Sequence, residues 1–380
     1  MSVARAESGY DMWLRYAPLE ANGLRAARQS VPVVVSTLGS STLEASARNE
    51  LTRGVHGMLD RTLRNASGFS TSEDAILLGT LDELKASAPA IALGFANTNL
   101  VTDSYWLKTV TVNGRRYLIV TGPNDRGVLY GAFALLRKLS LGESVTNLDD
   151  RQQPYAPVRW LNHWDNLEGT IERGYGGRSI FWDNLKSRTD LTKVADYGRF
   201  LASLGLNGTS INNVNVNTKS LTPEFFPEII RIADALRPWG VRTVLSVDFG
   251  SPQKIGGLDT FDPADPRVIA WWKDRIDALY RAVPDLGGII IKADSEGRVG
   301  PSVYGRTHAD AANVVARALK PHGGLIFYRG FVYDNHMDWN VLTNDRARAA
   351  DDNFRKLDGK FDDNVVIQIK HGPIDFQVRE

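Results

Sequence analysis

Residues 287–301 read GGIIIKADSEGRVGP, and the character of the sequence changes in the middle. The first half is a short β-branched block without polar alternation, which is typical of a strand buried on both faces of a parallel sheet. Lys292, Asp294 and Glu296 follow where this strand would end, and glycines and a proline then mark a turn. Charged groups at the carboxyl end of a barrel strand indicate an active site. The alternative interpretation is a solvated loop whose charges have no role.

The same alternation of strand-like and helix-like segments runs through the second part of the chain. Five further strands are predicted, at 158–164, 208–211, 241–247, 323–329 and 364–370. Helical patterns are predicted at 191–204, 224–238, 267–282, 308–320 and 346–357. Repeated βα alternation with polar strand ends favours an α/β fold with a (β/α)8 TIM barrel, of which about six βα units are present. Because an unclosed barrel leaves two unpaired strand edges, we expect a chain truncated at its C-terminus.

An N-terminal α/β domain is predicted before this barrel, over residues 1–150. Its expected elements are strands at 31–36 and 75–80, helices at 43–60 and 127–139, and a hairpin at 105–122 that turns at Asn113-Gly114. Asp125 is the expected cap of the second helix. A polar, proline-bearing segment at 149–157 is interpreted as the linker into the catalytic barrel, residues 151–380.

Composition limits the classes of function. The 380 residues carry 45 basic and 44 acidic side chains, a net charge of +1, so no global field favours nucleic acid or an anionic membrane. No apolar run approaches the ~18–20 residues of a membrane helix, and the first residues lack the apolar core of a secretory signal. With no cysteine, disulfides and thiolate metal sites are excluded. We expect no cofactor or metal, and a cytoplasmic protein, or alternatively a periplasmic or secreted one whose signal peptide is missing.

Cationic and aromatic side chains recur at the predicted strand ends. Lys292, Arg329 and Lys370 end three strands, and Trp164 ends the first strand of the predicted barrel. Aromatic rings stack on sugar faces, and grouped cations bind a carboxylate or phosphate, so a polyhydroxylated anion is a plausible ligand. Taken singly, each lysine is also explained as solvated and the tryptophan as core.

Two carboxylates at different strand ends suit glycoside hydrolysis. Glu296 is the candidate general acid, which burial or a neighbouring acid must keep protonated, and Asp375 is the candidate base. A rival mechanism makes Lys292 a Schiff-base nucleophile, as in aldolase-like barrels. We rank it lower, because Asp294 and Glu296 close by in the sequence favour the charged ammonium.

Five segments in order along the chain resemble the α-glucuronidases of glycoside hydrolase family 67. They are GYDMWLRY (9–16), GPNDRGVLYGAFALL (122–136), LNHWDNLEGTIERGYGGRSIF (161–181), KADSEGRVGP (292–301) and KHGPIDFQVRE (370–380). The resemblance implies an N-terminal α/β domain, a (β/α)8 catalytic barrel and a C-terminal, mainly helical dimerisation domain. A homodimer is therefore expected for the full-length enzyme, whose dimerisation domain is absent from these 380 residues.

The implied reaction is inverting removal of α-1,2-linked glucuronic acid, or its 4-O-methyl ether, from xylo-oligosaccharides derived from glucuronoxylan. Glu296 resembles the catalytic acid, and Asp375 one of two carboxylates that serve the attacking water. The second is a glutamate further along the family's chain, which Glu380 does not match. The resemblance assigns substrate contacts to five residues: Trp164, Val214, Lys292, Arg329 and Lys370. The alternative is an inactive fragment or a non-catalytic sugar-acid-binding protein.

Overall fold

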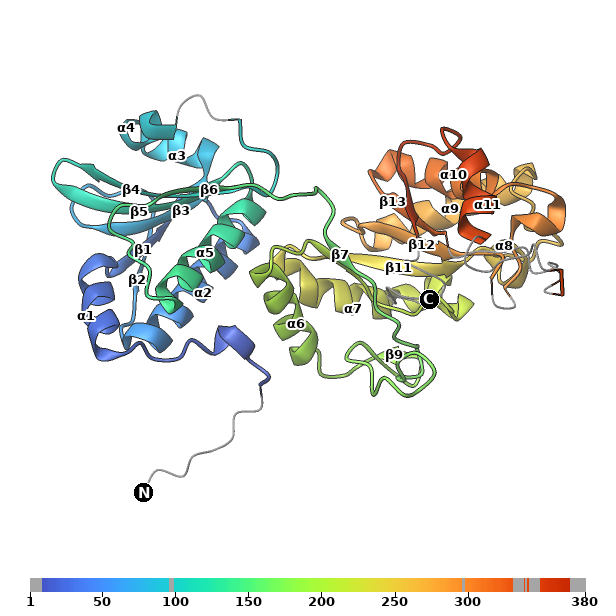
Figure 1. The fold of residues 1–380 in the computed structure, drawn as a ribbon, viewed down its shortest axis with the longest axis horizontal. Helices are drawn as coiled ribbons and strands as arrows, with labels where there is room; N and C mark the ends of the chain where they lie inside the picture. Colours follow the sequence, from blue (N-terminus) through green and yellow to red (C-terminus); the bar gives the residue numbers. More distant parts are fainter. Residues whose placement is uncertain are drawn as a thin grey trace, which may run out of the picture. The chain divides into compact units, whose positions relative to one another are not determined.

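The chain folds into two units, each described here by itself (Figure 1). The computed structural model describes residues 9–95, 99–295, 298–330, 338, 340–341 and 349–369. The first unit consists of residues 1–159, 196–207 and 238–241, and the second of 160–195, 208–237 and 242–380. Within the described residues, no helix is long and apolar enough to cross a membrane.

A mixed six-stranded sheet forms the centre of the first unit, in the order β2-β1-β3-β5-β4-β6. Its strands are β1 (Val34–Thr37), β2 (Arg64–Ser67), β3 (Ala75–Thr80), β4 (Tyr105–Val112), β5 (Arg115–Gly122) and β6 (Asp149–Gln152). Its helices are α1 (Ala21–Ser30), α2 (Thr42–Leu59), α3 (Leu81–Ser87), α4 (Pro89–Ala92) and α5 (Asp125–Ser140). Strands β1, β2, β3 and β5 pair in parallel, whereas β4 pairs antiparallel with β5 and β6.

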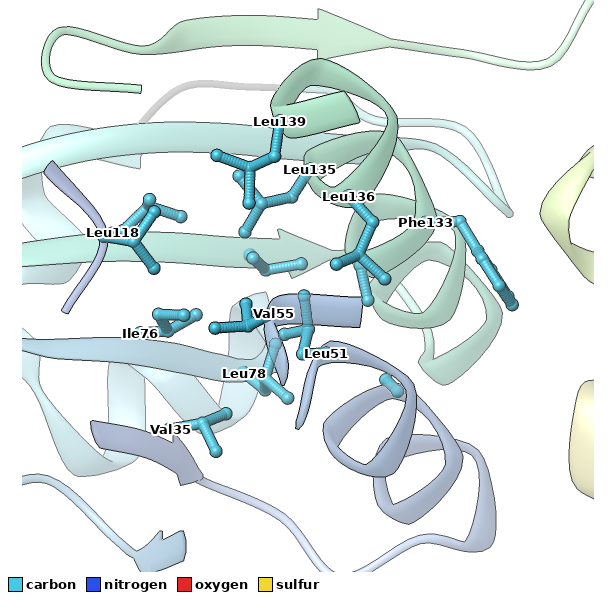
Figure 2. Packing of buried hydrophobic residues seen from close by; sticks show 14 of the residues in the cluster. Val35, Leu51, Val55, Ile76, Leu78, Leu118, Phe133, Leu135, Leu136 and Leu139 are labelled. Carbon is cyan, nitrogen blue, oxygen red and sulfur yellow. The ribbon is translucent and has the colours of Figure 1, made fainter. Parts of the chain in front are cut away.

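Alternate residues of these strands enter two separate cores, one on each face of the sheet. Ile76 and Leu78 pack against α2 and α5, while Leu77 between them packs on the opposite face. Figure 1 shows α2 and α5 on one side of the sheet and α3 and α4 on the other. In Figure 2 the side chains of the strands point toward Leu51 of α2 and Leu135 of α5. The unit is therefore a three-layer α/β/α sandwich.

Close packing of α2 on α5 depends on Gly54. A Cβ atom at Gly54 would lie 2.4 Å from Cδ2 of Leu136, closer than side-chain atoms approach one another.

Helix α2 begins at a capping box, in which Ser41 Oγ accepts from the Glu44 amide and the Glu44 carboxylate accepts from the Ser41 amide.

Several sequence expectations for this unit are confirmed, and the predicted cap of α5 is wrong. The hairpin turns at Asn113 and Gly114, with φ of 50° and 75° as a type I′ turn requires. The cap of α5 is Asn124, whose side chain accepts from the Gly127 amide, so Asp125 is the first helical residue and not the cap. The expected linker at 149–157 begins as edge strand β6, and β2 was not predicted.

The second unit contains a six-stranded sheet in the order β14-β13-β12-β11-β10-β7, with every pair parallel. Its strands are β7 (Trp160–Leu161), β10 (Gly208–Ser210), β11 (Arg242–Asp248), β12 (Gly288–Lys292), β13 (Leu325–Arg329) and β14 (Val365–Gln368). Helix α6 (Thr192–Ser203) follows β7 in the chain, and its residues from 196 onward belong to the first unit. The helices of the second unit are α7 (Phe226–Leu236), α8 (Ser251–Lys254), α9 (Pro266–Ala282), α10 (His308–Leu319) and α11 (Ala349–Phe354). A short antiparallel pair, β8 (Trp182–Asp183) with β9 (Lys186–Ser187), lies between β7 and α6.

This sheet is part of a TIM barrel, and the predicted fold class is confirmed. Six parallel strands follow one another with helical connections, as the sequence pattern indicated. The first of them is shorter than predicted, because only Trp160 and Leu161 of 158–164 pair with β10. In the described part of the chain β7 does not pair with β14, so these strands form an open half-barrel.

A buried ion pair joins two helical segments of the first unit. Nε of Arg199 lies 2.9 Å from both carboxylate oxygens of Glu50, and its Nη2 donates to Glu50 Oε1 at 2.6 Å. Tyr16 donates its hydroxyl proton to the same oxygen at 2.6 Å. Burial and the Glu50 carboxylate raise the pKa of the Tyr16 hydroxyl, so it remains a donor at any ordinary pH. Glu50 and the Arg199 side chain are 1% and 6% exposed, so water does not screen the pair.

Glu50→Gln is expected to destabilise the first unit by about 3–5 kcal/mol, because it leaves the buried Arg199 cation without a counter-charge. The measurement is urea unfolding followed by tryptophan fluorescence. The matched control is Glu73→Gln, which breaks the exposed pair with Arg64 and should change stability by less than about 1 kcal/mol. Equal effects of the two substitutions on the free energy of unfolding would show that the buried pair contributes no more to stability than the exposed pair.

Candidate active site

One face of the second unit's sheet carries the charged residues of three neighbouring strands. Asp248 at the end of β11 is the register partner of Lys292 at the end of β12. Ile291 pairs with Tyr328, so Lys292 and Arg329 each stand one residue further along their parallel strands. Because side chains alternate between faces, the three charged residues share a face. In a closed barrel this face points inward.

Apolar residues on the same face form a small cluster beneath the charges. Val244 and Ile290 are buried in it, two residues before Ser246 and Lys292 on their strands, and Phe327 packs against them. Trp164 and Val214 belong to the same cluster, so the loops after β7 and β10 pack over this part of the sheet. Trp164 and Val214, two of the predicted substrate contacts, therefore lie together.

Arg329 and Trp164 are in direct contact. The guanidinium carbon of Arg329 lies 5.6 Å from the ring centroid of Trp164, within cation–π range. Arg329 is 7% exposed, which fixes its planar donor group at the rim of the sheet. The contact places beside the Trp164 ring a group that binds carboxylates in a bidentate manner.

Lys292 is 5% exposed and donates to Oδ1 of Asn215 at 2.9 Å. Asn215 follows Val214 in the loop after β10, so the structure brings Lys292, Arg329, Trp164 and Val214 to one region. Their roles toward a substrate stay predictions.

Three of the predicted site residues lie outside the described part of the chain: Glu296, Asp375 and Lys370. The residues that flank Glu296 in the sequence are nevertheless firmly held. Ser295 and Arg298 pair as an antiparallel bridge. Nη1 of Arg298 donates to Oδ2 of Asp248 at 2.6 Å and to the carbonyl of Val216 at 3.2 Å.

Asp294 is a structural residue in this segment. It is fully buried and takes a left-handed backbone conformation with φ of 48°. Its carboxylate accepts from the hydroxyl of Ser302 at 2.6 Å and from the amide of Ser302 at 3.1 Å. Gly300 permits this approach, since a Cβ there would lie 2.6 Å from Asp294 Cγ. The carboxylate thus anchors the segment after β12 to the turn that follows.

Tyr328, which precedes Arg329 in β13, lies on the other face of the sheet. Its hydroxyl is 2.9 Å from Nδ1 of His308 on α10, and its ring is fully buried. Burial and the negative charge of Asp294 raise the pKa of Tyr328 well above its ordinary value. Tyr328 is therefore a core residue and does not line the candidate site.

The polar groups at the predicted strand ends include His163, Asp165 and Asn215, but sequence reasoning did not indicate their partners and did not single out Arg298. Asn215 contacts Lys292, and Arg298 contacts Asp248, in both cases across a long sequence separation. Oδ2 of Asp165 and Nδ1 of His163 are 3.2 Å apart, and these two residues are separated by only one position in the chain. One signal was available for the asparagine: in INNVNVN (211–217) polar and apolar residues alternate, which indicates opposite directions for Val214 and Asn215.

Two family profiles match this chain in succession. Residues 12–135 match the Glycosyl hydrolase family 67 N-terminus, and residues 138–380 match the Glycosyl hydrolase family 67 middle domain. Among curated relatives, the probable alpha-glucuronidase A of Neosartorya fischeri is 45% identical over 382 residues, covering 100% of this chain. The alpha-glucuronidase of Hypocrea jecorina is 47% identical over 389 residues, covering 99% of it. The chain spans 44% of the length of each of these relatives.

Solved structures resemble the chain in fold alone. The protein described as "Structure of CpGH84D" superposes with a TM-score of 0.53 at 13% identity, covering 90% of this chain and 52% of that chain. A GH138 enzyme targeting pectin rhamnogalacturonan II gives a TM-score of 0.50 at 14% identity, covering 89% of this chain and 38% of that chain. The family profiles cover more of the chain than these structural superpositions do, because together they extend over residues 12–380. The chain belongs to glycosyl hydrolase family 67.

Proposed function

We propose that this chain supplies most of the catalytic barrel of an α-glucuronidase, which releases α-1,2-linked glucuronic acid or its 4-O-methyl ether from xylo-oligosaccharides with inversion. The observation that carries the proposal is the grouping of Lys292, Arg329 and Trp164 at the carboxyl end of a half-barrel. Two relatives that align with almost the whole chain bear the name alpha-glucuronidase.

The recognition step follows from the charges. A uronic acid differs from a neutral hexose by one carboxylate, and Lys292 and Arg329 offer a point charge and a planar fork to bind it. Both are almost fully buried, where an ionic hydrogen bond is stronger than in water. The Trp164 ring provides an apolar surface for the sugar ring beside the Arg329 guanidinium.

The chemical step assigns two carboxyl groups. Glu296 protonates the oxygen of the leaving xylose, and Asp375 takes a proton from the water that attacks the anomeric carbon from the opposite side. Inversion requires the two carboxyl groups to stand roughly 6.5–9.5 Å apart, so that the water fits between base and sugar. The Arg298–Asp248 contact and the Asp294–Ser302 contacts hold described residues before and after Glu296 in the sequence.

A Schiff-base role for Lys292 is disfavoured by its surroundings. The amide oxygen of Asn215 accepts a hydrogen bond from Nζ, and the carboxylate of Asp248 lies on the adjacent strand in register. Both stabilise the ammonium form, whereas a nucleophilic lysine must lose its proton.

Release of glucuronic acid from aldouronic xylo-oligosaccharides tests the proposal. We expect release by a chimaera that joins these 380 residues to the remaining length of the Hypocrea jecorina relative, because that length supplies the second water-activating glutamate that the resemblance implies. The 380-residue chain is assayed beside it. If the chimaera is folded and releases no acid, the proposal is wrong; release by the 380 residues alone would instead rule out the inactive-fragment alternative.

Glu296→Gln in the chimaera should lower kcat by about 10²–10⁴-fold, since the leaving oxygen loses its proton donor. The affinity for free glucuronate, measured by calorimetry, should change less than about twofold, because glutamine keeps the size of the side chain. Glu224→Gln on the exposed surface is the control and should leave both quantities unchanged. Near-normal hydrolysis by the first variant would remove Glu296 from the mechanism.

Selection for the uronate carboxylate is expected to depend on Lys292 and Arg329. Lys292→Met and Arg329→Met should each weaken glucuronate binding about 10–100-fold, the equivalent of one charged hydrogen bond. Binding of a neutral α-glucoside should change much less. The exposed Lys219→Met is the control. A loss that is the same for the acid and for the neutral sugar would contradict charge recognition and indicate general damage to the pocket.

A further inference from the structure

Two capping boxes of the first unit lie at the carboxyl ends of β1 and β3. Helix α2 follows β1 and is capped by Ser41, whose amide donates to Oε2 of Glu44 at 3.3 Å. Helix α3 follows β3 and is capped by Thr80, whose amide and hydroxyl donate to Oε2 of Glu83 at 2.7 and 2.9 Å. The two helices cover opposite faces of the sheet (Figure 1), yet each begins with a glutamate at the same end of it.

Glu44 and Glu83, which we call the carboxyl pair, come together over Gly39. A Cβ atom at Gly39 would overlap both Oε1 of Glu83 and Oε2 of Glu44, so the glycine leaves the space in which the two carboxyl groups lie. The groups are within hydrogen-bonding reach of each other. Two ionised carboxylates repel one another at such a distance, and a proton or a cation between them removes the repulsion.

Oε1 of Glu44 is the atom that requires a further partner. Glu44 is 1% exposed, and this oxygen is buried without a hydrogen-bond partner in the described part of the chain. An ionised carboxylate only accepts hydrogen bonds, so an ionised Glu83 does not satisfy an ionised Glu44. A protonated Glu44 donates to the Glu83 carboxylate, and both groups are then satisfied.

A proton fits the carboxyl pair better than a metal ion. Calcium and magnesium take about six or more oxygen ligands, most often with several carboxylates among them. Within the described ranges, no three histidine, aspartate or glutamate side chains are grouped so that they could hold a metal ion. Two carboxyl groups that already accept hydrogen bonds from Ser41 and Thr80 offer too few free oxygens.

The two members of the pair respond to this contact in opposite directions. Burial, the hydrogen bond to Glu83 and the negative charge of Glu83 raise the pKa of Glu44 to about 8. Burial also acts to raise the pKa of Glu83, but the hydrogen bonds from Glu44 and Thr80 outweigh it and lower that pKa. The proton therefore resides on Glu44, and Glu83 accepts from it.

The charged groups around the carboxyl pair favour retention of the proton. Asp125 at the start of α5 adds a negative charge that raises the pKa of Glu44, and Asp82 on α3 adds one beside Glu83. Arg126, which follows Asp125 on α5, donates to Asp103 at 2.8 Å. Its positive charge is thus committed to another carboxylate.

We propose that the carboxyl pair shares one proton and forms a pH-sensitive lock between α2 and α3, closed in acidic and neutral solution and open in mildly alkaline solution. When the proton passes to solvent, two carboxylates face each other at the starts of both helices, and their repulsion loosens the first turns. The lock lies in the first unit, and the inference does not depend on the proposed function.

Stability is expected to fall as the pH rises. In the unfolded chain Glu44 loses its proton near the ordinary value of 4.5, whereas in the folded chain it keeps the proton up to about pH 8. Between these values the folded chain binds one proton more than the unfolded chain, so each pH unit raises the unfolding equilibrium constant by up to about tenfold. Below the lower value this contribution to stability is complete.

The first measurement follows the carboxyl ¹³C signals of the 380-residue chain labelled with ¹³C-glutamate, from roughly pH 4 to pH 10. One signal should titrate near pH 8, far above the other glutamates, and it should be absent in Glu44→Gln. In Glu83→Gln the Glu44 signal should titrate at least about one pH unit lower, because the neighbouring negative charge is lost.

The second measurement is urea unfolding of the same proteins. Between about pH 5 and pH 8, the unfolding equilibrium constant of the unchanged chain should rise about 10–1000-fold relative to that of Glu44→Gln, whose side-chain amide is neutral throughout and donates to Glu83. Two controls should retain the full pH dependence. They are Glu20→Gln, at the exposed start of α1 where it forms no capping hydrogen bond, and His56→Gln, which removes the only histidine of the first unit.

Three results would overturn the inference. The first is a titration in which every glutamate loses its proton below about pH 6. The second is a pH dependence of unfolding that persists unchanged in Glu44→Gln. The third is a shift of the Glu44 signal by millimolar Ca²⁺ or Mg²⁺ at neutral pH, which would show that the pair holds a cation. If Glu44→Gln does not fold, the titration of the unchanged chain decides, because ordinary pKa values for all glutamates exclude a shared proton.

Discussion

Parallel pairing in register between β11, β12 and β13 is the constraint on which the candidate site depends. The pairing fixes Asp248 beside Lys292 and sets Arg329 at the same level of the sheet. A shift of one residue in β12 would move Lys292 to the helix-covered face and bring Ile291 to the site. The buried residues on that covered face, such as Ile289 and Ile291, oppose such a shift because they would lose their apolar surroundings.

The same alternation explains how one short strand serves both the core and the site. In β12, Ile289 and Ile291 face the helices, while Ile290 and Lys292 face the inner side of the half-barrel. A strand buried on both faces shows no polar alternation in its sequence, so its pattern reveals burial but not direction. Direction becomes visible only from the partners in register, which lie about forty residues away on each side.

Sequence reasoning therefore found the elements more readily than their connections. The hairpin at Asn113 and Gly114 and the strands of the half-barrel follow from local turn chemistry and apolar runs, and both were predicted. The cap of α5 was misplaced by one residue because Asn124 and Asp125 are both good capping residues, and only the backbone geometry separates them. Edge strand β6 was missed because its polar residues are specified by pairing with β4 and not by burial.

For the candidate site, residue type indicated which side chains carry charge, and the fold determined what holds them. Asp248 illustrates the limit: at the end of a strand it resembles a catalytic carboxylate, yet its Oδ2 accepts from both Lys254 and Arg298. These two contacts give Asp248 the role of an anchor for cationic side chains. Its contact with Arg298 ties the segment after β12 to the end of β11. The distinction between a reacting acid and a supporting one thus lies in the partners, which sequence position alone does not supply.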